Sequence, residues 1–225
     1  MKDQPYIVIM AGGVGSRFWP YSKSSKPKQF LDVLGTGRTL LQMTFDRFRE
    51  IAPAEQFYVV TNQAHASLVS EQLPELLDHQ ILAEPLRKNT AACLAYAAYK
   101  ISNLDPNATM VVTPADHLIL QEGRFLQTLV TAISAAQVHN RLLTIGIKPN
   151  RPETGYGYIQ YLPDSEDTQV LKVKTFTEKP NAKLAATFLE SGDFVWNSGM
   201  FVWKVESLIE AFKQHMPDLA DAFEE

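Results

Sequence analysis

Short, uninterrupted runs of apolar and largely β-branched residues recur along the chain up to about residue 148. Such runs are typical of buried strands, and they lie at residues 6–10, 57–60, 81–84, 109–113 and 142–147. Between them, apolar residues follow helical spacing at residues 40–51, 64–72, 90–101 and 125–139. Thr39 can cap the first of these helices. The alternation predicts an α/β fold in which helices flank a mostly parallel central sheet on both faces.

The pattern changes beyond residue 148, where glycine, proline and tyrosine become frequent. Strands are predicted at residues 156–161, 170–177 and 200–203, and helices at 182–190 and 206–214. The polar tract at residues 163–168 is most simply a hairpin turn between two of these strands. Since no linker or internal repeat interrupts the chain, we expect one domain over residues 1–225, with a first part at 1–148 and a smaller, β-rich part at 149–225.

Composition narrows the class of protein. The chain has 225 residues, of which 45% are hydrophobic, and this is enough for one α/β domain with a substantial core. A net charge of −4 and a pI near 5.8 argue against a general nucleic-acid or membrane-surface binder. The single cysteine, Cys93, lies in a helical segment and is predicted to be a core residue of a protein in a reducing compartment.

No stretch approaches the roughly 20 apolar residues of a membrane span. The apolar segment near the N-terminus is too short for a signal peptide and has no small-residue cleavage site behind it. The sequence therefore predicts a cytoplasmic protein without a membrane partner.

The first predicted strand runs into a turn that contains Gly12, Gly13 and Gly15. Four cations follow, and no acidic residue occurs between Asp3 and Asp32; the cations are Arg17, Lys23, Lys26 and Lys28. Glycines allow positive φ and a close approach of the backbone, so successive N–H groups can point at phosphate oxygens. This combination predicts a polyphosphate site at the position where α/β folds bind their ligands.

The two familiar phosphate motifs do not fit this turn. The Gly-Lys-Ser/Thr string of the ATPase loop is missing, and Phe18 stands where the dinucleotide motif has its third glycine. Because Pro20 and Pro27 disfavour helical geometry in the residues before them, we expect the loop to stay extended after the glycines.

Asp116 comes just after the apolar strand at residues 109–113. At the carboxyl end of a central strand, its carboxylate would reach the ligand crevice, where it suits Mg²⁺. A turn or helix cap is the other interpretation, and the residues alone favour it.

Seven segments in order resemble sugar-1-phosphate nucleotidyltransferases. They are GGVGSRFWP (residues 12–20), PKQFL (27–31), EPLRKNTAA (84–92), TPADH (113–117), GYGYI (155–159), FTEKP (176–180) and WNSGM (196–200). The FWP and PKQFL portions resemble mannose-1-phosphate guanylyltransferases in particular. The resemblance implies a Rossmann-like, nucleotide-diphospho-sugar transferase fold, in which residues 1–148 bind the nucleotide and 149–225 bind the sugar phosphate. It further implies that GTP and mannose 1-phosphate react with Mg²⁺ to give GDP-mannose and pyrophosphate.

The same resemblance implies roles for individual residues. Ala11 and the glycines of the turn would bind the nucleotide, Arg17 would hold the leaving β- and γ-phosphates, Lys28 would lie near the α-phosphate, and Asp116 would bind the metal. Asn89 and Thr90 match the base and ribose segment, but they could equally cap the following helix. The attacking phosphate is already an anion, so the reaction needs positioning and charge neutralisation rather than a general base.

Guanine presents two donors, N1–H and its exocyclic amine, and one carboxylate can accept from both. Glu84, at the end of a predicted strand, is our hypothesis for this role.

On the sugar side, the resemblance implies that Gly157 lets the backbone approach the sugar ring, while Glu178 and Asn197 contact its hydroxyls. Lys179 would pair with the sugar phosphate. Without the resemblance, the segments at 178–180 and 197–199 are an ordinary charged turn and an ordinary bend. Trp196 and Trp203 are predicted to be core residues.

The chain ends earlier than the catalytic domains of the resembled family, which continue to another metal-binding aspartate. We therefore interpret it as truncated at its C-terminus, or as a short homologue that completes its metal site differently. Two alternatives to the implied function stay open: a non-catalytic sugar-nucleotide sensor, and the same reaction with another hexose 1-phosphate. The sequence leaves the oligomeric state open, a homo-oligomer included.

Overall fold

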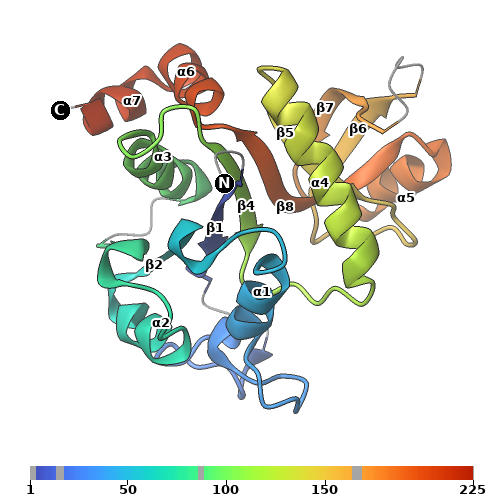
Figure 1. Ribbon diagram of the computed structural model, residues 1–225. Helices are drawn as coiled ribbons and strands as arrows, with labels where there is room; N and C mark the ends of the chain where they lie inside the picture. Colours follow the sequence, from blue (N-terminus) through green and yellow to red (C-terminus); the bar gives the residue numbers. More distant parts are fainter. Residues whose placement is uncertain (1–3, 14–17, 86–88, 164–168, 225) are drawn as a thin grey trace. The chain divides into compact units, whose positions relative to one another are not determined.

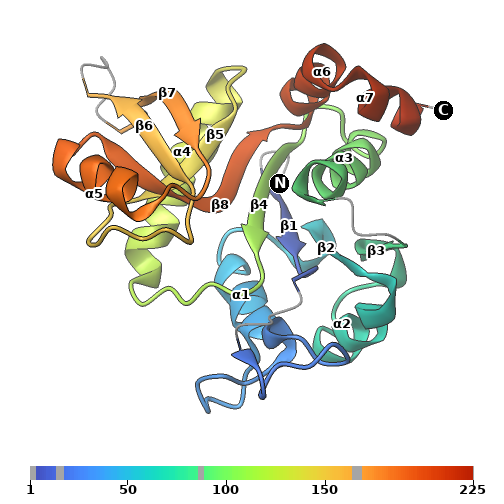
Figure 2. The same cartoon turned by 180° about the vertical axis from the view of Figure 1, so that it is seen from behind.

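The structure is a computed structural model that describes residues 4–13, 18–85, 89–163 and 169–224 (Figures 1 and 2). The chain forms two compact units, one of residues up to Leu142 together with those from Val202 onward, and one of residues Leu143–Phe201. The change of sequence pattern instead puts a division at residue 148 and groups all of 149–225 together. The C-terminal segment returns to the first unit because α6 (Val205–His215) and α7 (Pro217–Glu224) pack with α3 (Asn89–Ser102).

A parallel sheet forms the centre of the first unit. Its strands lie in the order β3 (Ile81–Glu84), β2 (Phe57–Asn62), β1 (Tyr6–Met10) and β4 (Thr109–Pro114). In the register of these strands, Met10 lies opposite both Val60 and Pro114. Parallel strands bring their carboxyl ends to one edge of the sheet. The last residues of β1, β3 and β4 therefore gather at that edge.

Helices flank this sheet, as the sequence predicts. The helix α1 (Leu40–Phe48) packs on β1, α2 (Ala66–Gln72) on β2 and β3, and α4 (Glu122–Val138) on β4, while α3 contacts β1, β2 and β3. Ile7, Val8 and Ile9 are all completely buried. Since successive strand residues point to opposite faces, β1 is covered on both sides.

The second unit has an antiparallel sheet. Here β6 (Tyr158–Leu162) pairs with both β7 (Lys172–Thr177) and β8 (Phe194–Lys204), and β5 (Leu143–Ile147) also pairs with β8. The helix α5 (Ala182–Ser191) contributes Ala185 to a core that it shares with Tyr158, Phe194 and Trp196. The core roles predicted for Trp196 and Trp203 are confirmed, with 7% and 5% exposure. Of the predicted polar hairpin turn, residues 164–168 lie outside the described residues.

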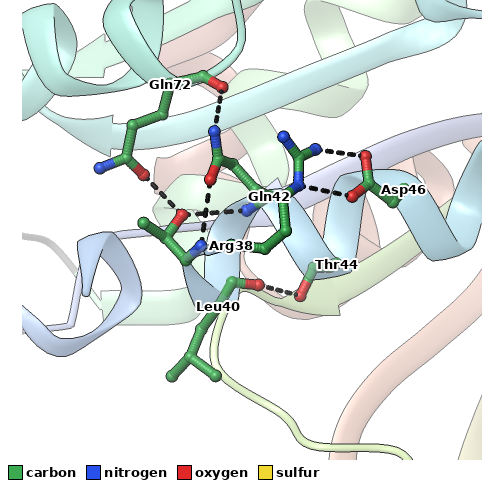
Figure 3. A network of polar contacts seen from close by, with 7 residues as sticks. Arg38, Leu40, Gln42, Thr44, Asp46 and Gln72 are labelled. Carbon is green, nitrogen blue, oxygen red and sulfur yellow. Dashed lines mark hydrogen bonds and ion pairs between the residues drawn. The ribbon is translucent and has the colours of Figure 1, made fainter. Parts of the chain in front are cut away.

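The first helix starts in a capping box, shown in Figure 3. The Thr39 hydroxyl accepts a hydrogen bond from the Gln42 backbone N–H at 3.3 Å, and the Gln42 side chain accepts one from the Thr39 N–H at 3.0 Å. The same hydroxyl donates to the Gln72 side chain at the end of α2, at 2.7 Å. The predicted Thr39 cap is confirmed, and it also joins two helices.

Replacing Thr39 with alanine is expected to lower the free energy of unfolding by about 1–2 kcal/mol, because the cap and the contact with α2 are lost together. Urea unfolding measures this change. Thr128→Ala is the matched control, since the Thr128 hydroxyl donates to the Arg124 carbonyl one turn back on the exposed side of α4. Alanine is the better helix former there. Equal losses in the two variants would contradict the capping interpretation.

Candidate functional site

A cavity of about 350 Å³ lies at the carboxyl edge of the parallel strands in the first unit. In Figure 2, the blue segment that comes after β1 in the chain lies past the arrowheads of β1 and β4, at this same edge. Open α/β sheets bind their ligands at this edge. The cavity is lined by Met10, Gly12, Gly13, Gln29, Val60, Glu84, Thr90, Cys93, Pro114, Ala115 and Asp116.

The glycine turn begins at a firmly held residue. Ala11 is buried, its N–H donates to the Val60 carbonyl at 2.8 Å, and its carbonyl accepts from the Thr61 hydroxyl at 3.1 Å. Gly12 and Gly13 follow, and no atom of the described residues lies within 4 Å of where a Cβ on either would stand. Neither glycine uses the positive φ that its residue type allows. Because neither glycine has a side chain, the space beside the backbone stays open to a ligand.

The segment after the turn does not stay extended. The Phe18 carbonyl accepts from the N–H groups of Tyr21 and Ser22, and the short helix η2 (Lys28–Phe30) follows. The prediction of an extended loop is wrong here because proline is as compatible with a tight turn as with extended chain. Gly15 and Arg17 lie outside the described residues.

Lys28 and Asp116 form an ion pair at the cavity. The Lys28 ammonium on η2 contacts the Asp116 carboxylate, which follows β4. Both side chains are mostly buried, with exposures of 27% and 22%. The Phe18 ring also lies under the ammonium, 5.8 Å from centroid to Nζ. In the ligand-free protein each charge therefore neutralises the other, and an incoming anion would compete with Asp116 for Lys28.

Glu84 and Cys93 both line the cavity. Glu84 is the last residue of β3, and burial raises the pKa of its carboxyl group. Burial, followed by the negative charge of Glu84, raises the pKa of the Cys93 thiol to about 12. Cys93 is thus a buried, protonated thiol, as predicted. Thr90 also lines the cavity. It lies with Asn89 inside α3, as the first two residues of that helix.

The second unit gathers the four residues predicted for sugar binding. The Asn197 N–H donates to the Gly157 carbonyl at 2.8 Å. A Cβ on Gly157 would lie 2.8 Å from the Glu178 carboxylate, so only glycine fits without movement. Lys179, whose φ is 43°, pairs its ammonium with Glu178 at 2.8 Å. The side chains of Glu178 and Lys179 are more than half exposed.

Comparison with known proteins decides the family. The model of the nucleotidyl transferase family matches residues 6–225. The chain belongs to this family.

Among relatives of this nucleotidyl transferase, a mannose-1-phosphate guanylyltransferase from Escherichia coli is 40% identical over 97% of the chain and 48% of its own length. A crystal structure described as mannose-1-phosphate geranyltransferase from Thermus thermophilus is 31% identical, with a TM-score of 0.88 over 98% of this chain and 63% of the other. One described as mannose-6-phosphate isomerase from Helicobacter pylori is 30% identical, with a TM-score of 0.79 over 98% and 78%. These likenesses confirm the predicted transferase fold. The chain spans about half the length of the curated relatives it matches.

Sequence reasoning missed one polar residue of this nucleotidyl transferase cavity, Gln29. Its side chain turns back to the glycine turn, and no local pattern predicts such an orientation. Among the helices of the described residues, none has both the length and the apolar character that crossing a membrane requires.

Proposed function

We propose that this nucleotidyl transferase transfers the guanylyl group of GTP to mannose 1-phosphate, forming GDP-mannose and pyrophosphate. The observation that carries the proposal is the Lys28–Asp116 ion pair beside Gly12 and Gly13, at the edge where an α/β sheet binds nucleotides. The names of the three neighbours above each specify a mannose phosphate, and this supports mannose 1-phosphate over another hexose phosphate.

In the proposed reaction, an oxygen of the mannose 1-phosphate attacks the α-phosphorus of GTP. A new oxygen–phosphorus bond forms, while the bond from the α-phosphorus to the oxygen that bridges to the β-phosphate breaks. Pyrophosphate leaves with the electron pair of that bond. The attacking oxygen is already anionic, so the protein has to position the two phosphates and neutralise their charge. The Lys28 ammonium supplies positive charge, and the backbone at Gly12 and Gly13 supplies a surface that phosphates can approach.

Asp116 is the residue that would hold Mg²⁺. Its carboxylate lines the cavity, and Mg²⁺ commonly takes one or two carboxylates and completes its shell with waters and substrate phosphates. Within the described part of the chain, no group of three or more metal-binding side chains gathers. The donor set therefore fits a metal carried largely by the nucleotide. When bound, Mg²⁺ supplies positive charge to the triphosphate.

Glu84 is proposed to accept hydrogen bonds from the two donors of guanine. It lies at the end of β3, in the same cavity as the ion pair. In the second unit, Glu178, Lys179 and Asn197 are proposed to contact the sugar phosphate, as they gather around Gly157.

The test is pyrophosphate release from GTP and mannose 1-phosphate with Mg²⁺. We expect release that requires both substrates and falls strongly when ATP replaces GTP. A panel of four nucleoside triphosphates against several hexose 1-phosphates then measures both preferences. Equal rates with another hexose 1-phosphate would contradict mannose as the substrate. Binding of GDP-mannose without any turnover would indicate that the protein is a sugar-nucleotide sensor and not an enzyme.

A further inference from the structure

The side chain of Gln29 bridges the glycine turn. It is 2% exposed, and its Nε2 donates to the carbonyl of Ala11 at 2.7 Å and to that of Gly13 at 3.0 Å. Both partners are carbonyl oxygens, which can only accept hydrogen bonds. The amide nitrogen and not the amide oxygen therefore faces them. One amide thus holds the residues on both sides of Gly12.

These contacts fix the direction of backbone groups. In a trans peptide the C=O and the following N–H point to opposite sides of the bond. Since the Ala11 carbonyl points at Gln29, the Gly12 N–H points away from it. Ala11 is also held by Val60 and Thr61, whereas in the described part of the chain the Gln29 amide is the contact that holds the Gly13 carbonyl. The orientation of Gly13 therefore depends on Gln29.

The short helix that carries Gln29 is itself anchored. The Phe30 carbonyl at its end accepts from the Gln72 amide at 3.1 Å. Gln72 belongs to the capping network of Figure 3, where the Gln42 amide donates to the Gln72 carbonyl at 3.0 Å. Lys28, next to Gln29 on η2, pairs with Asp116. One short helix thus carries both the ammonium and the amide that bonds Ala11 and Gly13.

We propose that Gln29 is a positioning residue, whose side-chain amide holds the backbone from Ala11 to Gly13 in the geometry that binds the phosphates of the nucleotide. The proposal rests on the proposed function for the identity of the ligand. Backbone that is already held in place from Ala11 to Gly13 loses less conformational entropy when the ligand binds, and this raises affinity. The role requires the two donors of the amide and not the length of the side chain alone.

Gln29→Met tests this role, because methionine has a similar length and no donor. Gln80→Met is the matched control. Gln80 is also 2% exposed on a short helix, η5 (Asp78–Gln80), and its Nε2 also donates to two backbone carbonyls, those of Ala54 and Phe57, both at 2.7 Å. It lies outside the cavity lining. The Gln80 Oε1 also accepts from the Leu77 N–H at 2.9 Å, so Gln80→Met removes one bond more than Gln29→Met and should lose at least as much thermal stability.

The readout is binding of Mg²⁺-free tripolyphosphate and of GTP, measured by titration calorimetry at a temperature where all variants are folded. We expect Gln29→Met to raise both dissociation constants about tenfold, which is the scale of one net hydrogen bond plus the lost order of the turn. Gln80→Met should change them less than about twofold, because its bonds lie away from the cavity. Affinities that are unchanged in Gln29→Met, or equally weakened in Gln80→Met, would overturn the proposal.

A second variant keeps the test decisive if Gln29→Met does not fold. Gln29→Asn retains the amide but is one methylene short of the carbonyls, and it should also weaken tripolyphosphate binding. Wild-type affinity in Gln29→Asn would refute the role. Turnover of wild-type protein is measured separately: tripolyphosphate binding without pyrophosphate release from GTP would count against the proposed function and leave the role of Gln29 standing.

Discussion

Replacing Lys28 with methionine is expected to lower kcat for GDP-mannose formation by about 10²–10³-fold, the usual cost of one preorganised group that stabilises transition-state charge. Methionine keeps much of the length and the apolar stem of lysine and removes the ammonium. The loss should appear in kcat at saturating GTP, because the charge is needed most as the bond to pyrophosphate breaks. Rapid-quench measurement of a single turnover separates this step from product release.

Asp116→Asn provides the complementary measurement. Lys28 loses its carboxylate partner in this variant, so an anionic ligand no longer has to displace one. Binding of Mg²⁺-free GTP should be as tight as in wild type or tighter, whereas Mg²⁺-dependent turnover should fall. Asp46→Asn is the control, because the Arg38–Asp46 pair in Figure 3 is exposed and neither residue lines the cavity. Such surface pairs contribute about 0–1 kcal/mol. Weaker GTP binding in Asp116→Asn, or turnover equal to that of wild type, would contradict this account.

The central strands were predictable because their signal is local. Each of β1, β2 and β4 is a run of apolar residues, largely β-branched, that is buried on both faces, so apolar character alone marks it. Apolar character alone does not identify the full length of β8. It begins at Phe194, although the apolar pattern predicts a strand only at 200–203, because Asn197, Ser198 and Gly199 interrupt the run. Its burial still alternates along the strand, and such alternation is the other signature of a strand.

Helix ends were less predictable than helix positions. α4 begins at Glu122, before the predicted start at residue 125, and α7 was not predicted. Pro217 at the first position of α7 and Asp218 in its first turn are helix-start signals that could have indicated it. Its packing against α3 adds Phe223, stacked on Tyr99 at 5.5 Å, a contact between residues far apart in the sequence.

The site was predictable where a residue lies at the end of a strand. Gly12, Glu84 and Asp116 each follow or end a parallel strand, and parallel register brings such positions together. The pairing of Lys28 with Asp116 was not predictable in this way, because it depends on where η2 lies in three dimensions. The hydrogen bonds of Gln29 were even less predictable, because their geometry exists only once the backbone from Ala11 to Gly13 and η2 have packed together.

Replacing Glu84 with glutamine is expected to lower the preference for GTP over ATP, measured as the ratio of kcat/KM values, by about 10–200-fold, which corresponds to about 1.5–3 kcal/mol for a hydrogen bond to a charged group. A carboxylate can accept from both guanine donors, whereas a carboxamide presents one acceptor and one donor, so one guanine donor would face an N–H group. Glu71→Gln, on the exposed side of α2, is the control. An unchanged preference for GTP in Glu84→Gln would refute the base-reading role.

The same variant should respond to pH in a defined direction. Because burial raises the pKa of Glu84, its carboxylate is protonated at a higher pH than an ordinary glutamate, and the wild-type preference for GTP should fall as pH is lowered through that value. Glu84→Gln should not show this fall. A raised pKa in the folded state also means that folding favours the neutral form, so the stabilising contribution is present below the unfolded pKa and lost as pH rises through the folded one. Ionisation of the half-buried Glu84 therefore costs stability as pH rises through its raised pKa, and Glu84→Gln should then have the higher Tm, by a margin that shrinks toward acid pH.

The pKa of the Cys93 thiol provides an independent measure of the negative charge on Glu84. The negative charge of Glu84 is the second cause, after burial, of the raised thiol pKa. Glu84→Gln should therefore lower the pKa of Cys93 from its value of about 12 and speed alkylation of the thiol at alkaline pH. If GTP preference falls while the Cys93 pKa and the Tm stay as in wild type, the Glu84 charge acts on neither the thiol nor the stability of the fold, and this account of its electrostatics is wrong. If all three change together, one half-buried carboxylate accounts for both the base preference and the cost in stability at neutral pH.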